Sequence, residues 1–392
     1  MPPYNSGGLG IACYQLCKSL SKTDIDIEFI LPYEADHGID FMDVTAAHPQ
    51  GVAEVIKSGI AYDSYKYFMS DGSIKWVNIH EQQALYEQAV GRLVDQREFD
   101  IVHAHDWLTF RAALRVKELK NCPIILHVHS VESDRAGNNF GNPLVREIES
   151  VGLHLADRII AISMHTKRAI VRDYGVPADK IEVIHNSIDS SEIVKLDDRN
   201  AYRYLAAMKQ VGYRVIVNVG RLTIQKGLPN LIRAAQLVIQ REPKTLLLIV
   251  GSGEQYAELV ALASDLGIGK NVIFADFQRG KRWRDAFGVA DLFVMPSVSE
   301  PFGLTPLEAI GYGAPALVSK QSGVSEVLRN CLKVDYWDID EMANNIIAVM
   351  RNDSLRDELW QNAYREYQTL SWDDASKKIK QVYTKHLAEV AS

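Results

Sequence analysis

The feature that most constrains the fold of this 392-residue chain is a regular alternation of short apolar runs with longer amphipathic stretches. Short apolar runs bounded by polar residues are typical of buried strands, whereas longer stretches with an apolar residue every three or four positions are typical of helices. Strands separated by helices pair in parallel, because each crossover returns the chain to the same end of the sheet. The sequence therefore predicts an α/β protein with parallel sheets.

The alternation occurs in two series. In the first, strands are predicted at 25–31, 100–104, 124–128, 158–162 and 180–185, with a helix over 82–96. In the second, strands are predicted at 215–219, 246–250, 272–274, 292–295 and 316–318, with a helix near 230–240. Residues 190–211 are polar and lack a strand pattern, which places the linker there.

Two such series predict two doubly wound, Rossmann-like domains that face each other across a cleft, over residues 1–195 and 210–371. A helical pattern follows near 372–392, and packing back on the first domain is one arrangement open to it. In a doubly wound domain a strand precedes the first glycine-rich turn, but here only six residues precede Gly7. We therefore expect the first N-terminal strand to be missing, with a hydrophobic groove in its place and a poorly anchored loop over 5–10.

The composition disfavours several classes of protein. A hydrophobic fraction of 47% is enough to build large cores without disulfides or structural metals. The net charge of -7 argues against general nucleic-acid binding, and against binding an anionic membrane through net charge alone. No apolar window of about 18 residues predicts a transmembrane segment. The first ten residues, MPPYNSGGLG, lack the basic and apolar regions of a signal peptide.

The four cysteines are expected to be buried free thiols. Cys13 and Cys17 lie close enough in sequence for two metal ligands, but no second pair follows at the spacing of a zinc site. Few and scattered cysteines fit a reducing compartment, so a cytoplasmic localisation is expected.

The first candidate site follows the strand predicted at 215–219, in the segment NVGRLTIQKG. Arg221 and Lys226 lie here, flanked by Gly220 and Gly227. A flexible loop with two cations suits a diphosphate, whose oxygens need hydrogen-bond donors and charge compensation. The alternative interpretation is two solvated surface cations.

The second candidate site is the segment SEPFGLTPLEAIGYG, in which Glu300 and Glu308 are separated by seven residues. A helix is predicted to begin near Leu307, and the N–H groups at a helix start favour phosphate oxygens. The backbone amides of residues 302–304 (Phe302, Gly303 and Leu304) are the expected donors. Both carboxylates could accept hydrogen bonds from sugar hydroxyls, whereas a lone Glu at a helix start also serves simply to compensate the helix dipole.

These two segments together resemble the retaining glycosyltransferases of family 4, which have the GT-B architecture. Further matches run along most of the chain: NSGGLG near the start, DIVHAHDW at 100–107, ADRIIAIS at 156–163, KIEVIHNSID at 180–189, IVGSGE at 249–254 and ADLFVMPS at 290–297. The HAHDW and GGLG segments look most like the glycogen and starch synthase branch. The resemblance implies transfer of a hexosyl unit from a nucleotide-diphosphate sugar to a hydroxyl of a glycan or other acceptor, an α-glucan among them.

The resemblance also implies roles for individual residues on the side of the first domain. Gly7 and Gly8 would form the loop that approaches the donor phosphate and the acceptor. His129 would lie near the C6 hydroxyl of the donor sugar and the reacting centre. Glycogen synthases of bacteria usually carry a lysine shortly before the paired glycines, whereas Asn5 and Ser6 stand here, so the donor base is left open.

In the second domain the resemblance implies most of the donor site. Arg221 and Lys226 would compensate the charge of the diphosphate leaving group. Glu300 would hold the C3 and C4 hydroxyls of the sugar, and Glu308 would hold the ribose. The base would lie near residues 277–278 (Phe277 and Gln278).

The residue types suggest how the reaction would proceed. Charge that develops on the diphosphate would be stabilised by the two cations and by the amides of residues 302–304. The resemblance implies attack from the same face with the leaving phosphate as base, so no cofactor and no divalent metal is expected. His103, His105 and Asp106 could serve as metal ligands, but a helix cap at Asp106 and a lining of the cleft are the better-supported interpretation.

Two alternatives to a transferase remain at this stage. One is a sugar-nucleotide epimerase or a phosphorylase on the same architecture, and the other is a non-catalytic binder of sugar nucleotides. The basic run Arg279, Lys281, Arg282 and Arg284 reads as a solvated helix face, with an anionic acceptor or a peripheral contact with a membrane as the alternative.

Overall fold

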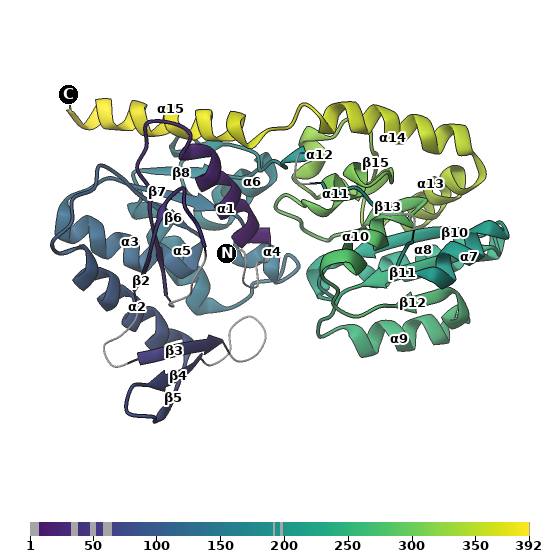
Figure 1. Cartoon of the computed structure of the whole chain (residues 1–392), viewed down its shortest axis with the longest axis horizontal. Helices are drawn as coiled ribbons and strands as arrows, with labels where there is room; N and C mark the ends of the chain where they lie inside the picture. Colours follow the sequence, from purple (N-terminus) through teal and green to yellow (C-terminus); the bar gives the residue numbers. More distant parts are fainter. Residues whose placement is uncertain are drawn as a thin grey trace.

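The computed structural model describes residues 8–32, 38–47, 52–57, 65–190, 193–196 and 199–391. Figure 1 shows two α/β lobes side by side, with the last helix running along the first lobe. The predicted fold class is confirmed, because each lobe contains a parallel sheet with helices packed against it.

The second lobe contains one six-stranded parallel sheet in the order β12-β11-β10-β13-β14-β15. Counted from the first strand of the lobe, this is the 3-2-1-4-5-6 order of the Rossmann fold. The strands are β10 (Arg214–Val219), β11 (Thr245–Val250), β12 (Val272–Phe274), β13 (Leu292–Met295), β14 (Ala316–Ser319) and β15 (Leu332–Val334). The strands at the centre of the sheet are almost wholly buried, because helices cover both faces.

The helices of the second lobe follow the crossover pattern that the sequence predicts. They are α8 (Leu228–Arg241), α9 (Tyr256–Asp265), α10 (Gly280–Gly288), α11 (Thr305–Gly311), α12 (Val324–Val327), α13 (Ile339–Arg351) and α14 (Asp353–Tyr367). In α8 the apolar side chains recur with helical spacing and Leu228, Leu231, Ile232, Ala235 and Val238 are buried against the sheet. The segment predicted as a linker also contains a helix, α7 (Arg203–Gln210), because Leu205 is buried in the core of this lobe.

The first lobe contains a four-stranded parallel sheet and a separate pair of parallel strands. The sheet is β6 (Val102–His105), β7 (Ile124–Val128), β8 (Arg158–Ala161) and β9 (Ile181–Val183), and the pair is β1 (Glu28–Leu31) with β2 (Asp43–Ala46). Among the described residues no strand joins β1 to β6. The predicted absence of a first strand is not tested by this, because residues 1–7 lie outside the described part of the chain. The groove predicted between them stays a prediction.

The helices of the first lobe are α1 (Gly8–Leu20), α2 (Ile79–Val94), α3 (Trp107–Lys120), α4 (Glu132–Arg135), α5 (Pro143–Leu155) and α6 (Met164–Tyr174). Local signals set the ends of α6. The Ser163 side chain accepts the backbone N–H of Thr166 at the start, and Gly175 takes the left-handed conformation, with φ 67°, at the end.

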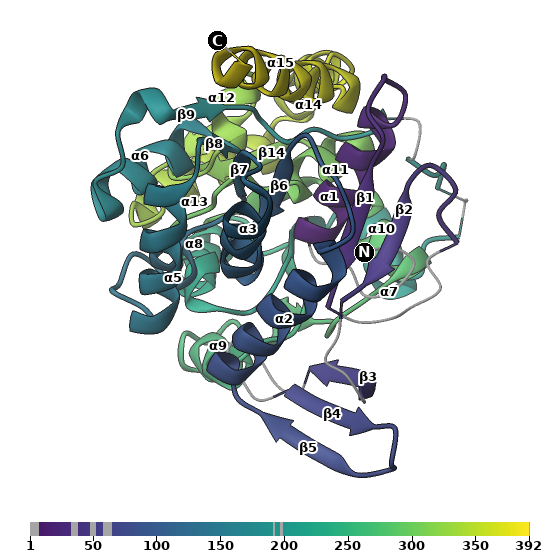
Figure 2. The same cartoon turned by 90° about the vertical axis from the view of Figure 1, so that its left-hand side faces the viewer.

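One sequence prediction about this lobe is wrong, and one sheet was not predicted. Residues 8–10 are not a poorly anchored loop, since they form the first turn of α1, and residues 5–7 lie outside the described part of the chain. Helix α1 forms despite two glycines in that turn because its apolar face is buried. The sequence pattern also missed the antiparallel sheet of β3 (Val52–Lys57), β4 (Tyr65–Met69) and β5 (Ile74–Val77), which projects from the lobe in Figure 2.

The C-terminal helix α15 (Trp372–Ala391) packs on the first lobe although it follows the second in sequence (Figure 1). Trp372 and Ile379 are buried together with Leu16 of α1. The hydroxyls of Ser19 and Ser376 lie 2.9 Å apart in the same contact. The helix therefore ties the two lobes together by burying apolar surface on α1.

Two glycines with similar backbone angles allow a test of how tightly the turn at Gly227 packs against its neighbours. Gly227 has φ +63°, and a Cβ there would lie 2.2 Å from the carbonyl oxygen of Pro296, whereas Gly267 has φ +71° with nothing within 4 Å. Gly267→Ala is expected to cost about 1 kcal/mol of unfolding free energy through backbone strain alone. Gly227→Ala is expected to cost about 1–3 kcal/mol more. Urea unfolding measures both, and equal losses would contradict the close approach at Gly227.

Candidate active site

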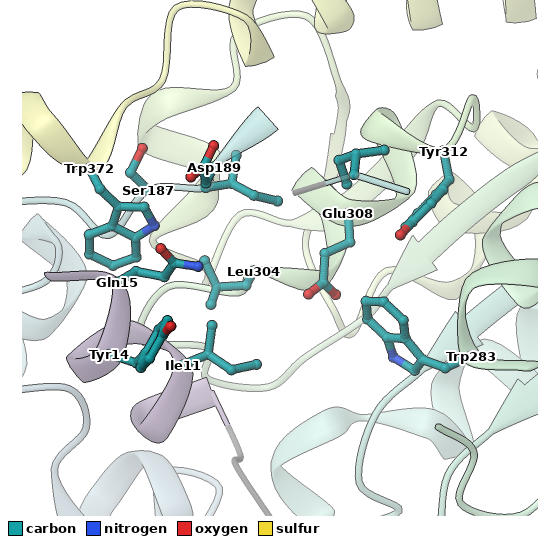
Figure 3. A pocket seen from close by; sticks show the side chains of 12 residues that line it. Ile11, Tyr14, Gln15, Ser187, Asp189, Trp283, Leu304, Glu308, Tyr312 and Trp372 are labelled. Atoms are coloured by element: carbon teal, nitrogen blue, oxygen red, sulfur yellow. The ribbon is translucent and has the colours of Figure 1, made fainter. Parts of the chain in front are cut away.

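A cavity of about 470 Å³ lies between the two lobes. Its walls are side chains from α1, the segment after β9, α10, α11 and the start of α15: Ile11, Tyr14, Gln15, Ser187, Ile188, Asp189, Ile193, Trp283, Leu304, Glu308, Tyr312 and Trp372. Figure 3 shows Tyr14, Gln15 and Trp372 on one side and Trp283 and Tyr312 on the other. Both lobes therefore contribute to one cleft, which is where parallel α/β sheets bind ligands.

Glu308 is the acidic side chain that points into this cavity from the second lobe (Figure 3). It lies in the first turn of α11, directly after a loop that also carries Glu300. Burial raises the pKa of the Glu308 carboxyl to about 8, because the apolar surroundings penalise its charged form. At neutral pH the carboxyl holds its proton in this environment, so it is able both to donate and to accept a hydrogen bond.

Glu300 and Lys226 form an ion pair within the second lobe, so the structure brings together two predicted site residues. Glu300 is only 8% exposed and also accepts a hydrogen bond from the Ser297 hydroxyl at 3.1 Å. A buried carboxylate is costly without a cation and donors, and these two partners supply them. Lys226 ends the short 3-10 helix η3 (Ile224–Lys226), and the left-handed Gly227 follows it.

Arg221 lies on the same loop as Lys226, but its side chain has different surroundings. Its side chain is exposed, and the guanidinium donates to the Gln225 side-chain oxygen at 3.3 Å. Among the described residues no carboxylate pairs with Arg221. The loop therefore presents one cation that is paired internally and one that is available to an anion.

The loop before α11 offers the backbone amides that the sequence predicts. None of the N–H groups of Phe302, Gly303 and Leu304 donates a hydrogen bond to another part of the chain that the structure describes. Gly303 has φ +94°, and a Cβ there would lie 2.9 Å from the Met295 methyl carbon, so the turn requires glycine. Helix α11 has only 7 residues, so the loop amides are the groups that this turn offers to an anion.

His129 follows β7 in the first lobe and is buried. Its backbone N–H donates to a carboxylate oxygen of Asp106 at 2.6 Å, and that of Ser130 donates to the same oxygen at 3.3 Å. The Asp106 side chain therefore does not cap α3, as one interpretation expected; with φ 59° at the helix start, its carboxyl turns toward the end of β7. Burial lowers the pKa of His129 to about 3, and His103 acts in the same direction, so the imidazole is neutral.

Contacts between the lobes fix the loop that carries Glu300. The Ser299 hydroxyl donates to a carboxylate oxygen of Asp134 at 2.5 Å. Asp134 lies five residues after His129 in the first lobe. The Ser163 hydroxyl donates to the Pro301 carbonyl at 2.6 Å. A Cβ at Gly323 would lie 2.6 Å from the Ser163 Cβ, so the lobes approach each other closely here.

Glu326 adds a charged contact between the lobes that sequence reasoning missed. It accepts the backbone N–H groups of Met164 and His165, both at 2.8 Å, at the start of α6 in the other lobe. It also accepts from the His185 ring at 2.7 Å. Burial would raise the pKa of Glu326, but hydrogen bonds from His185 and the two amides outweigh it, and the pKa is lowered. Of its three partners, only His185 lies in a segment that the sequence pointed to, KIEVIHNSID at 180–189.

The remaining predicted residues lie at the edge of the site. Gly8 is exposed at the start of α1, and Gly7 lies outside the described residues. Phe277 is 57% exposed, with the Arg279 guanidinium 5.1 Å above its ring. The Gln278 side chain donates to the Ala275 carbonyl at 2.5 Å. Neither residue lines the cavity, whose aromatic walls come from side chains that the sequence did not single out.

Comparison with protein families resolves which class of enzyme this cleft belongs to. The model described as Glycosyltransferase Family 4 matches residues 6–192, and the model described as Glycosyl transferases group 1 matches residues 207–366. The chain belongs to glycosyltransferase family 4. It is a glycosyltransferase with the GT-B architecture, and the family predicted from the sequence is confirmed.

Individual relatives agree with this assignment. The transferase is 28% identical to an uncharacterized glycosyltransferase of Methanocaldococcus jannaschii, over 97% of this chain and 95% of the relative. It is 26% identical to a glycogen synthase of Mycobacterium tuberculosis, over 84% of this chain and 78% of that one, which supports the predicted likeness to glycogen synthases. A solved structure of the Anabaena protein HepE, in complex with UDP and glucose, has a TM-score of 0.74 at 19% identity and 97% coverage of both chains. Among the described residues, no helix of the transferase is both long and apolar enough to span a membrane.

The raised pKa of Glu308 predicts how the stability of the transferase depends on pH. Its ordinary value is 4.5 and its folded value about 8, so the folded state holds a proton that the unfolded state loses between these pH values. The contribution of Glu308 to stability is complete below about pH 4.5 and is lost as the pH rises toward 8. In Glu308→Gln this loss is absent.

The measurement is the free energy of unfolding of the wild type minus that of Glu308→Gln, at several pH values from 5 to 8. It is expected to fall with a slope of at most about 1.4 kcal/mol per pH unit. Glu258→Gln, an exposed side chain of α9 in the same lobe, is the matched control and should follow the wild type. Parallel curves for the wild type and Glu308→Gln would contradict the buried, protonated carboxyl.

Proposed function

We propose that the transferase moves a hexosyl unit from a nucleotide-diphosphate sugar to an acceptor hydroxyl with retention of anomeric configuration. The observation that supports this most strongly is the set of groups on two loops of the second lobe, which the Lys226–Glu300 pair joins. The Lys226–Glu300 pair, the exposed Arg221 and the unoccupied amides of residues 302–304 all lie at the strand ends of the second lobe. This combination suits a diphosphate next to a sugar.

The donor would be held mainly by the second lobe. Arg221, Lys226 and the amides of residues 302–304 would bind the diphosphate oxygens. Glu300, which already accepts from Ser297, has further lone pairs for two sugar hydroxyls. Glu308 would bind the ribose, with its carboxyl directed into the cavity. The neutral His129 ring would hydrogen-bond the C6 hydroxyl of the sugar from the other lobe.

In this arrangement every bond that breaks is matched by a bond that forms. The bond from the anomeric carbon to the donor phosphate oxygen breaks, and its electron pair goes to the diphosphate. Lys226, Arg221 and the loop amides stabilise this charge as it develops. The acceptor oxygen forms the new bond from the same face, and its proton passes to the departing phosphate. No side chain forms a covalent bond to the sugar, and the chemistry needs neither a cofactor nor a metal.

The acceptor would enter through the half of the cavity formed by α1 and α15. Tyr14 and Trp372 lie there, and aromatic rings of this kind pack well on the apolar faces of sugar rings. The glycogen synthase among the relatives makes an α-glucan the first acceptor to test. The UDP and glucose bound by HepE make UDP-glucose the first donor, with ADP- and GDP-sugars beside it. A peripheral contact with a membrane and a cytoplasmic localisation stay predictions.

Replacing Lys226 tests the diphosphate site. Lys226→Gln removes the cation but leaves a hydrogen-bond donor for the buried Glu300. The initial rate of UDP release with acceptor present is expected to fall about 10²- to 10³-fold, with the melting temperature lowered only slightly. Lys270→Ala, an exposed lysine of the same lobe, is the control and should keep full activity. A fully active Lys226→Gln variant would refute this role for the lysine.

The configuration of the product separates the proposed reaction from its alternatives. With an α-linked nucleotide sugar, proton NMR of the first turnovers is expected to show an α-linked product that forms only when acceptor is present. A β-linked product would rule out retention. Conversion of the donor sugar without any acceptor would instead indicate an epimerase, and a requirement for inorganic phosphate would indicate a phosphorylase.

A further inference from the structure

Four histidines gather on one face of the sheet in the first lobe. His103 and His105 come from β6, and His127 and His129 come from β7 and the residue that follows it. The parallel register pairs His105 with His127, which places all four side chains on the same face. The rings stack with centroids 4.4 Å apart for His127 and His129, and 4.5 Å apart for His103 and His105.

A cysteine thiol from helix α1 lies next to the four histidines. Cys13 lies in α1 and is buried, and its Sγ and one ring nitrogen each of His105 and His129 all lie within 4.8 Å of one another. His103, His105 and His127 form a second trio with the same spacing. A sulfur and several imidazole nitrogens are the ligands that zinc prefers in proteins.

The nitrogen atoms have the separation that a single ion needs. His105 Nδ1 and His129 Nε2 lie 3.0 Å apart, and His103 Nε2 and His127 Nδ1 lie 3.2 Å apart. Two nitrogens bound tetrahedrally to zinc at about 2.0–2.1 Å lie about 3.3 Å apart. Small rotations of the rings would therefore be enough to admit the ion between His105 and His129.

Two ring nitrogens are also left without any partner. His127 Nε2 and His129 Nδ1 are buried and make no hydrogen bond within the part of the chain that the structure describes, and the two side chains are only 2% and 7% exposed. Buried polar atoms normally find a partner. These two are not the nitrogens that would face the ion, which are His105 Nδ1 and His129 Nε2. The Asp106 side chain, which holds the backbone of His129, also lies close to Cys13.

We propose that Cys13, His105 and His129 bind a zinc ion, with His103 and His127 as the neighbouring imidazoles that support them. Binding releases the Cys13 thiol proton to solvent, because the thiolate is the ligand. The ion binds a ring nitrogen of His129. The proposed function needs this ring to hydrogen-bond the donor sugar. Zinc therefore acts as an inhibitor of transfer and competes with the donor, and this part of the inference rests on the proposed function.

Cobalt provides a readout of the site that does not depend on activity. The full chain is freed of metal by a chelator, titrated with Co²⁺ and followed by absorption. One tetrahedral cobalt ion per chain is expected, with a thiolate-to-cobalt charge-transfer band that Zn²⁺ abolishes. Cys13→Ser is expected to lose this band. Cys17→Ser, a buried thiol one turn along the same helix that belongs to neither trio, is the matched control and keeps it.

The outcomes separate the site from its effect on the reaction. Absence of a tetrahedral cobalt spectrum in the wild type, or an unchanged band in Cys13→Ser with both variants folded by circular dichroism, overturns the site. Zinc is expected to inhibit the wild type at least tenfold and to inhibit Cys13→Ser much less, with the inhibition relieved by donor. A cobalt site without such inhibition supports the site and overturns the regulation. If the proposed transfer reaction is not observed, the cobalt spectrum still tests the metal site, because it does not depend on activity.

Discussion

The buried carboxylate of Glu300 is the constraint on which the site depends. A charge in this position is stable only while a cation and hydrogen-bond donors remain in contact with it. Lys226 and Ser297 provide these contacts from within the second lobe. The neighbouring residues Ser299 and Pro301 are then held by the first lobe, through Asp134 and Ser163. The loop that carries this carboxylate is therefore held from both lobes.

This arrangement prepares the cleft electrostatically before any ligand enters. The cations lie on the second lobe, where charge would develop on the leaving group, and the neutral His129 lies on the first. Glu326 holds the start of α6 with its carboxylate, so the docking of the lobes itself uses helix N–H groups. Preorganised groups of this kind stabilise a transition state without having to rearrange during the reaction.

Local patterns in the sequence predicted the parts of the fold that depend on local physics. The bounds of β12 and β13 follow uninterrupted apolar runs, which occur where helices cover both faces of a sheet. Lys226 and Glu300 could be chosen because each follows a strand end, where a doubly wound sheet opens to ligands. Their direct contact could not be read from the sequence, because 74 positions separate them.

The failures have equally physical reasons. Gly8 and Gly10 disfavour a helix by propensity, and tertiary burial of α1 under α15 overrides this preference. Asp106 looks like a helix cap, but its backbone conformation directs the carboxyl to β7 instead.

A crystal structure of the transferase with an intact nucleotide sugar would test the central claim most directly. The account predicts that the diphosphate lies within hydrogen-bond distance of Lys226 Nζ, the Arg221 guanidinium and the amides of residues 302–304, with a sugar hydroxyl on Glu300. A diphosphate bound elsewhere, with the Lys226–Glu300 pair facing no ligand, would contradict it.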